Sequence, residues 1–129
     1  MKVNRFEDLE IWKLAAEIAV DIYKITSEKK FIRDYGLRDQ LRRAAISISS
    51  NIAEGFEINN NNDLIRFLKV AKGSAGELRS QLLICSRLDY ITEKQTEEIK
   101  DKLLLLSAKI GKFISYLLVK RRNKEFLTR

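Results

Sequence analysis

Apolar residues recur at intervals of three and four in four separate stretches of this chain. That interval places them on one face of an α-helix. The four stripes are Ile11, Ala15, Ile18, Ile22 and Ile25; Leu37, Leu41, Ala45, Ile48 and Ile52; Leu68, Ala71, Ala75, Leu78, Leu82 and Cys85; and Ile99, Leu103, Leu106, Ile110, Phe113 and Leu117. Four such helices with short connections pack as antiparallel neighbours. The pattern predicts an all-α protein, an antiparallel up-down four-helix bundle forming one domain over residues 1–129.

The expected helices span about residues 7–30, 37–55, 63–88 and 93–122. The chain contains no proline, which suits long uninterrupted helices. In the first helix a second apolar seam accompanies the stripe, as packing against two neighbours requires; it contains Leu9, Trp12, Ala16, Ala19 and Tyr23. Residues 123–129 are expected to form a tail in which Phe126 and Leu127 could dock on the bundle.

Helix ends are marked by residues that satisfy the unpaired backbone groups there. Asn4 with Glu7, and Thr92 with Gln95, have the spacing of capping pairs. Gly55 is expected to end the second helix in the left-handed conformation. Asparagine favours local turns over helix, so the run 59–62 is expected to be a loop.

The chain has no histidine and one cysteine, and this composition removes most catalytic and metal chemistry. Neither a histidine-based triad nor a histidine zinc or di-iron site can form. Cys85 lies on the third stripe and is interpreted as a buried small apolar residue. No apolar stretch approaches the roughly 18 residues of a membrane span, and the N-terminus lacks a secretory signal pattern. We therefore expect a cytoplasmic protein that is not an enzyme, with no cofactor, no metal and no membrane partner.

Several local strings in this order resemble one bacterial family. They are FEDLEIW at residues 6–12, YGLRDQLRRAA at 35–45, SI at 47–48, NIAEG at 51–55, AKGS at 71–74 and EL at 77–78. In combination they resemble the four-helix bundle family of the 23S rRNA intervening-sequence protein, over residues 6 to about 118. The family is related to the accessory protein of diversity-generating retroelements, which works with a reverse transcriptase and nucleic acid.

The resemblance implies a ring of identical subunits, a homopentamer, and RNA, DNA or a protein as further partners. It implies no agreed enzymatic activity, and the family name records gene location without establishing a ribosomal role. Periodicity independently indicates that the protein is not a monomer. Residues 103–106 are four consecutive leucines, and a helix turns about 100° per residue, so they cannot all face one core. Leu105 and Tyr116 lie outside the main stripe and are candidates for an interface.

The polar residues of the family-like strings allow two interpretations. Asn51, Glu54, Ser74 and Glu77 form either a functional site or a hydrogen-bond network that fixes the register of the second and third helices. With no histidine or metal cluster nearby, we favour the structural network over paired carboxylate catalysis. Gly73 and Gly76 interrupt the third helix, which suggests a close approach between helices there. Their spacing does not fit a phosphate-binding loop.

The formal net charge is +7. The candidate nucleic-acid-binding residues are Arg38, Arg42, Arg43, Arg66, Lys69, Lys72, Arg79, Lys109, Lys112, Lys120, Arg121 and Arg122. They indicate an oligomeric, non-enzymatic scaffold that binds RNA or DNA electrostatically, with weak sequence selectivity and strong salt dependence. No signature with stacking aromatics accompanies them. The alternative is a protein–protein assembly module whose basic charge serves solubility.

Overall fold

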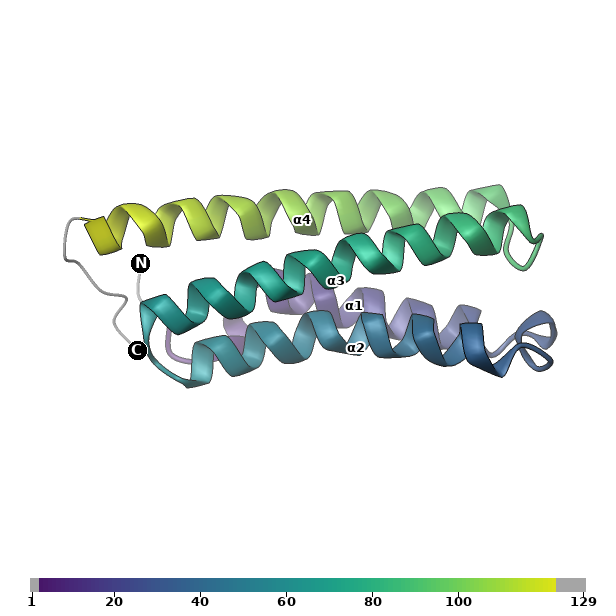
Figure 1. Cartoon of the computed structure of the whole chain (residues 1–129), viewed down its shortest axis with the longest axis horizontal. Helices are drawn as coiled ribbons and strands as arrows, with labels where there is room; N and C mark the ends of the chain where they lie inside the picture. The colour runs from purple at the N-terminus through teal and green to yellow at the C-terminus, as the bar shows by residue number, and fades with distance from the viewer. Residues whose placement is uncertain (1–2, 123–129) are drawn as a thin grey trace.

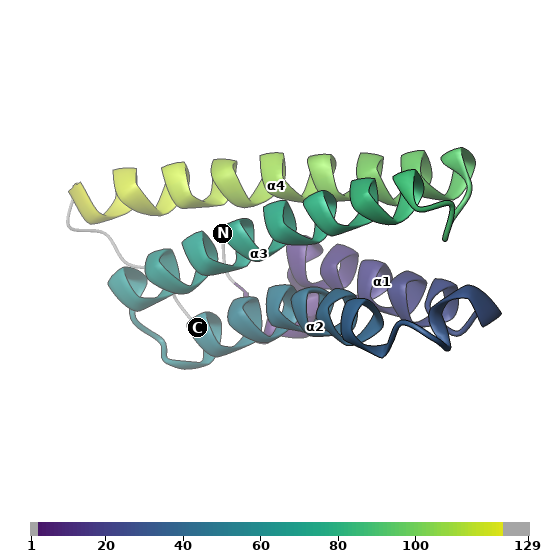
Figure 2. The same cartoon turned by 45° about the vertical axis from the view of Figure 1, so that its right-hand side comes forward.

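A computed structural model describes residues 3–122, so the tail expected at 123–129 lies outside the described residues. Four helices run side by side along the long axis, and successive helices point in opposite directions (Figures 1 and 2). They are α1 (Glu10–Ile25), α2 (Tyr35–Glu57), α3 (Asn61–Arg87) and α4 (Glu93–Arg122). Two short 3₁₀ helices, η1 (Phe6–Asp8) and η2 (Lys29–Phe31), flank α1. No strand occurs within the described range, and the antiparallel four-helix bundle is confirmed.

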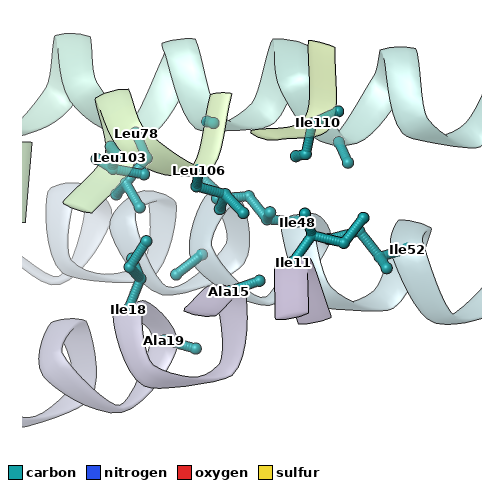
Figure 3. Close-up of a cluster of buried hydrophobic side chains, with 14 of the residues drawn as sticks. Ile11, Ala15, Ile18, Ala19, Ile48, Ile52, Leu78, Leu103, Leu106 and Ile110 are labelled. Carbon is teal, nitrogen blue, oxygen red and sulfur yellow. The ribbon is translucent and has the colours of Figure 1, made fainter. Parts of the chain in front are cut away.

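The apolar stripes form one core at the centre of the bundle. Figure 3 shows part of it, with Ile18 of α1, Leu78 of α3 and Leu106 of α4 among the labelled side chains. Apart from Leu37 and Phe113, every residue of the four predicted stripes is buried. Ile114 takes the expected place of Phe113, which is half-buried. The second seam of α1 is only partly buried, and Tyr23 is 42% exposed.

The prediction of one continuous helix over residues 7–30 is wrong. Leu9 has extended backbone between η1 and α1. Arg5, and not the expected Asn4, is the residue that precedes the first helical turn, and it pairs with Asp8 at 2.9 Å. At the other end the Thr26 hydroxyl donates to the Ile22 carbonyl at 2.6 Å. Hydroxyls that bond to the preceding turn compete with helix continuation, and α1 ends there.

The end of α2 also differs from the prediction. Gly55 lies inside the helix, which continues to Glu57, and no glycine of the described chain has positive φ. Asn59 adopts the left-handed conformation instead, with φ of 59°. Asn60 then caps α3 by accepting the Asp63 amide proton at 3.1 Å. Helix α3 therefore begins at Asn61, and the connection is formed by residues 58–60 instead of the loop predicted over 59–62.

The glycines predicted to mark close helix approach are the wrong ones. Gly73 and Gly76 are exposed, and a Cβ added at either would meet nothing within 4 Å. The close approach is at Gly55, where an added Cβ would lie 2.7 Å from the Cβ of Phe67. Helices α2 and α3 are therefore closest near the tight connection that joins them.

The Thr92–Gln95 capping box is confirmed by both of its hydrogen bonds. The Gln95 amide donates to the Thr92 hydroxyl at 3.1 Å, and the Thr92 amide donates to the Gln95 side chain at 2.9 Å. Because this cap satisfies backbone groups at the start of the longest helix, Thr92→Ala should destabilise the protein by about 1 kcal/mol. Thr92→Ser keeps the hydroxyl and should be close to neutral. Urea denaturation followed by circular dichroism measures both, and an equal loss for both variants would contradict the capping role.

Candidate nucleic-acid interface

Of the four polar residues predicted to form a network, Asn51 and Ser74 form hydrogen bonds with Ser47, and Glu54 and Glu77 do not. The Ser74 hydroxyl lies 2.9 Å from the hydroxyl of Ser47, and the Asn51 amide donates to both the carbonyl and the hydroxyl of Ser47. All three contacts are half-buried; the one between Ser47 and Ser74 joins α2 to α3, whereas the Asn51 bonds lie within α2. They fit the interpretation of a structural network. Glu54 and Glu77 are exposed on the same two helices and take no part in these bonds. Sequence reasoning missed Ser47, although its position four residues before Asn51 was an available signal.

Cys85 is fully buried on the core side of α3, as expected. Burial, with a smaller contribution from the Asp34 charge, raises the pKa of the thiol to about 11. The reactive thiolate is therefore scarce at neutral pH.

Across residues 3–122 no group of three or more histidine, cysteine, aspartate or glutamate side chains could hold a metal ion. None of the helices described is long and apolar enough to cross a membrane.

Four of the candidate basic residues are held by contacts within the bundle. Arg38 pairs with Asp39 at 3.1 Å, Arg66 with Asp63 at 3.3 Å, and Lys109 with Glu10 at 2.8 Å. Arg42 donates to the Thr26 hydroxyl at 2.9 Å and stacks on the Tyr23 ring. The Lys109 and Arg42 contacts join α1 to α4 and α2, whereas the Arg38 and Arg66 pairs lie within α2 and α3, so each of these four side chains already has a partner in the bundle.

Three other candidate basic residues lie together on one side of the molecule, along α3. Lys69, Lys72 and Arg79 follow one another along α3 at steps of three and seven, which places them on one stripe of the helix. None of the three forms an ion pair with a described carboxylate. A Cβ added to Gly111 of α4 would lie 3.9 Å from the Lys72 ammonium, so this stripe borders α4.

The end of α4 extends this basic surface. Arg121 donates to the Asn62 side chain at 3.0 Å, and Arg122 is exposed beside it. After Asp101, the rest of α4 to Arg122 contains no acidic residue. We call Lys69, Lys72, Arg79, Arg121 and Arg122 the basic seam between α3 and α4. It is about 25 Å long, because 17 residues separate Asn62 from Arg79 at about 1.5 Å per residue.

The remaining candidates lie elsewhere. Arg43 is exposed on the outer side of α2, and Lys112 borders an apolar hollow with Val3, Leu9 and Phe113 on the side of α4 nearest α1. Lys120 stacks over Tyr116 on that same side. The register that joins Lys72 to Gly111 could not be found from the sequence, because it depends on how α3 and α4 are aligned in space. The one available signal was Gly111, because a glycine in α4 leaves space for a side chain that reaches across from a neighbouring helix.

The fold and this surface define a class of protein: an antiparallel four-helix bundle with a strip of basic side chains along one pair of helices. A family model described as 23S rRNA-intervening sequence protein matches residues 7–112, so the chain belongs to that family. It is also similar to a solved structure from Bacteroides thetaiotaomicron, a protein of unknown function from the S23 ribosomal protein family. The TM-score is 0.74 and the identity 26%, covering 81% of this chain and 97% of that one. No curated protein matches the chain.

Proposed function

We propose that this protein is a non-enzymatic oligomeric scaffold that binds RNA or DNA through the basic seam between α3 and α4. The observation that carries the proposal is that Lys69, Lys72 and Arg79 have no acidic partner among residues 3–122, while Arg38, Arg66 and Lys109 are paired. Lysine and arginine that lack carboxylate partners are the groups that neutralise phosphates and release counterions. The net charge of +7 would also attract a polyanion from a distance.

The shape of the seam suits a phosphate backbone better than bases. Its charges lie along about 25 Å of a straight helix pair, which is long enough to meet several phosphates. The exposed tyrosines, Tyr23 and Tyr35, belong to the helices on the opposite side, α1 and α2. Recognition of bases by stacking would need aromatic side chains within the seam. Binding is therefore expected to be salt-dependent and nearly independent of sequence.

The proposal is tested by removing three charges from the seam and, in a matched control, three paired charges. Lys69→Gln, Lys72→Gln and Arg79→Gln together should weaken binding to RNA and DNA at least tenfold at about 100 mM salt. The dependence of log K on log salt should become shallower by roughly 2 to 3, since each phosphate contact contributes about 0.7–0.9. Fluorescence anisotropy with labelled RNA and DNA across a salt series measures both quantities.

The control is Arg38→Gln, Arg66→Gln and Lys109→Gln, which removes the same charge from paired sites. It should weaken binding less than threefold. Equal effects of the two triple variants would show that net charge and not the seam controls binding. A wild-type protein that binds no nucleic acid even at low salt would leave the assembly module as the function.

That second function has its own support in exposed apolar side chains. Leu104 and Leu105 of α4 are 43% and 51% exposed, and Val20 and Ile46 are 52% and 42% exposed. Apolar groups clustered on a surface mark sites of association. We propose that the chain forms a homo-oligomer; five copies is the number that the family resemblance implies. In a ring the basic seam would be presented several times, which raises avidity for a long strand without new contacts.

A further inference from the structure

A hollow with an apolar lining lies beside the start of α1, on the side of α4 nearest α1. Its volume is about 410 Å³, and its apolar lining residues are Val3, Leu9, Ile11 and Phe113. Leu9 and Ile11 are buried, whereas Val3 and Phe113 are only half-buried. We call this feature the α1–α4 hollow. Its volume lies in the range of about 300–1,000 Å³ that is typical of sites for apolar groups.

The α1–α4 hollow lies where α4 extends past the start of α1 (Figure 1). Glu10, the first residue of α1, pairs with Lys109 at 2.8 Å, and α4 then continues through residues 110–122. This extension of α4 is about 20 Å long. Within the described chain η1 packs against α1 and α2 and not against α4. The side of the extension that faces α1 therefore has no helix beside it among residues 3–122.

That side of the α4 extension is aromatic. Phe113, Tyr116 and Lys120 follow one another at steps of three and four, so they share one stripe of the helix. The rings of Phe113 and Tyr116 are half-buried, with centroids 6.2 Å apart, and the Lys120 ammonium lies over the Tyr116 ring. An apolar side chain placed on this stripe would remove more of both rings from water, which is favourable.

The chain that follows α4 carries such side chains and has the required length. Phe126 and Leu127 are adjacent in the segment 123–129. An extended chain spans about 3.3–3.6 Å per residue, so these two residues reach about 14–17 Å from Arg122. Phe113 is nine residues before Arg122, which is about 13–14 Å along the helix. Asn123 suits a reversal of direction there, since asparagine tolerates the left-handed conformation that ends helices.

Two other apolar surfaces are beyond the reach of this segment. Leu105 is 17 residues before Arg122, or about 25 Å along α4. Val20 is next to Asp21, which pairs with Lys102 at 2.7 Å, so it lies about 30 Å from the end of α4. The α1–α4 hollow is close enough for Phe126 and Leu127, whereas these two surfaces are not.

The charges at the rim of the hollow also fit the segment. Asp8 and Glu10 are already paired with Arg5 and Lys109. Lys112 is exposed at the rim and forms no ion pair with a carboxylate among residues 3–122. Glu125 precedes Phe126, so the apolar pair arrives with a carboxylate of the opposite sign.

We propose that residues 123–129 fold back along α4 and pack Phe126 and Leu127 into the α1–α4 hollow of the same chain. The segment then takes the place beside α4 that α1 leaves empty, and it covers the rings of Phe113 and Tyr116. Gly111 borders Lys72 of α3, and Arg122 is three turns after Gly111 on the same stripe. The basic seam is thus on another side of α4, and the docked segment leaves it open.

Disulfide trapping tests where the segment lies. Cys85 is the one cysteine of the chain, so Cys85→Ala provides a background without thiols. On it, Leu127→Cys with Lys112→Cys at the rim should form an intrachain disulfide, because docking brings the two Cα atoms within the roughly 4.4–6.8 Å that this bond requires. Intact mass and non-reducing electrophoresis follow the reaction, and circular dichroism verifies folding.

The matched control joins Leu127→Cys to Lys69→Cys on α3. Lys69 is one turn before Lys72, which borders Gly111, so it is at about the height of Phe113 but on the other side of α4. The Lys112 pair should close at least tenfold faster than the Lys69 pair. Equal rates would overturn the proposal, and so would a disulfide that joins two chains, because another copy's segment would then fill the hollow.

Thermal unfolding tests whether the contact is apolar. Phe126→Ser/Leu127→Ser should lower Tm by about 3 °C or more, since the hollow and both rings would be uncovered. Lys124→Ser/Arg129→Ser alters the same segment without changing the apolar pair and should leave Tm unchanged. In a Phe113→Ala background the Phe126→Ser/Leu127→Ser change should have less than half of its effect, because residues in contact are not additive. Equal losses in both backgrounds, or no loss in either, would overturn the proposal.

Discussion

Gly55→Ala is expected to destabilise the bundle by about 1–3 kcal/mol, although alanine is normally the better helix former. A Cβ at position 55 would lie 2.7 Å from the Cβ of Phe67 and 3.2 Å from a methyl carbon of Leu64. The first contact is with an atom next to the backbone, so rotation of the Phe67 ring cannot relieve it. Helices α2 and α3 would have to separate where a short connection joins them. Overpacking that moves the backbone has a cost of this size.

Gly73 and Gly76 provide matched controls for the Gly55 prediction. Both lie in the interior of α3, and an added Cβ meets nothing within 4 Å at either position. Gly73→Ala and Gly76→Ala should each stabilise the protein by about 0.5–1 kcal/mol, because alanine loses less backbone entropy in a helix. Urea denaturation of the three variants measures the differences. A Gly55→Ala protein as stable as the controls would show that α2 and α3 are not tightly packed at this point.

Phe31→Ala should destabilise the protein by about 3–5 kcal/mol, the range for removing a buried aromatic side chain. Phe31 belongs to the short connection between α1 and α2, yet it is fully buried. Its ring meets the edge of Tyr90 with centroids 5.4 Å apart, and Tyr90 follows α3 at the same end of the bundle. The alanine variant would leave a cavity where both connections close the core.

The surrounding hydrogen bonds predict smaller effects for neighbouring substitutions. The Tyr90 hydroxyl donates to Asp34 at 3.0 Å, which raises the pKa of Tyr90, and Asp34 also accepts the Leu37 amide proton at the start of α2. Tyr90→Phe keeps the ring and removes only the hydroxyl, so it should destabilise the protein much less than Phe31→Ala. Ile32→Ala, at an exposed position beside Phe31, should change stability by no more than about 0.5 kcal/mol. Thermal and urea unfolding of the three variants would disprove the role of Phe31 if Phe31→Ala and Ile32→Ala had equal effects.

The four helices could be found from the sequence because their signals are local. The 3–4 spacing of Leu68, Ala71 and Ala75 identifies a core face without knowledge of what covers it. The Thr92–Gln95 box likewise needs only four residues to form both of its bonds. Helix α4 accordingly begins at Glu93, where the sequence predicts, and it is helical as far as Arg122, the last residue described. Local strings also identified the family, which the match over residues 7–112 confirms.

The candidate site was predictable as a list of basic residues but not as a surface. Arg66 and Lys69 are three residues apart in one helix, yet Arg66 pairs with Asp63 while Lys69 has no described carboxylate partner. Lys109 pairs with Glu10, 99 positions away, which no local pattern could reveal. Which charges remain available for phosphate depends on these pairings.

By itself, the sequence determined that the chain forms four amphipathic helices, which residues face the core, and that histidine chemistry is impossible. Only the tertiary structure decided which glycine sits at the close approach, because Gly55, Gly73 and Gly76 all occur within helices and differ only in what lies opposite them. The burial of Phe31 and the alignment of Lys72 with Gly111 were decided in the same way. Helix periodicity acts within about a turn, whereas the distance between two helices depends on every side chain packed between them.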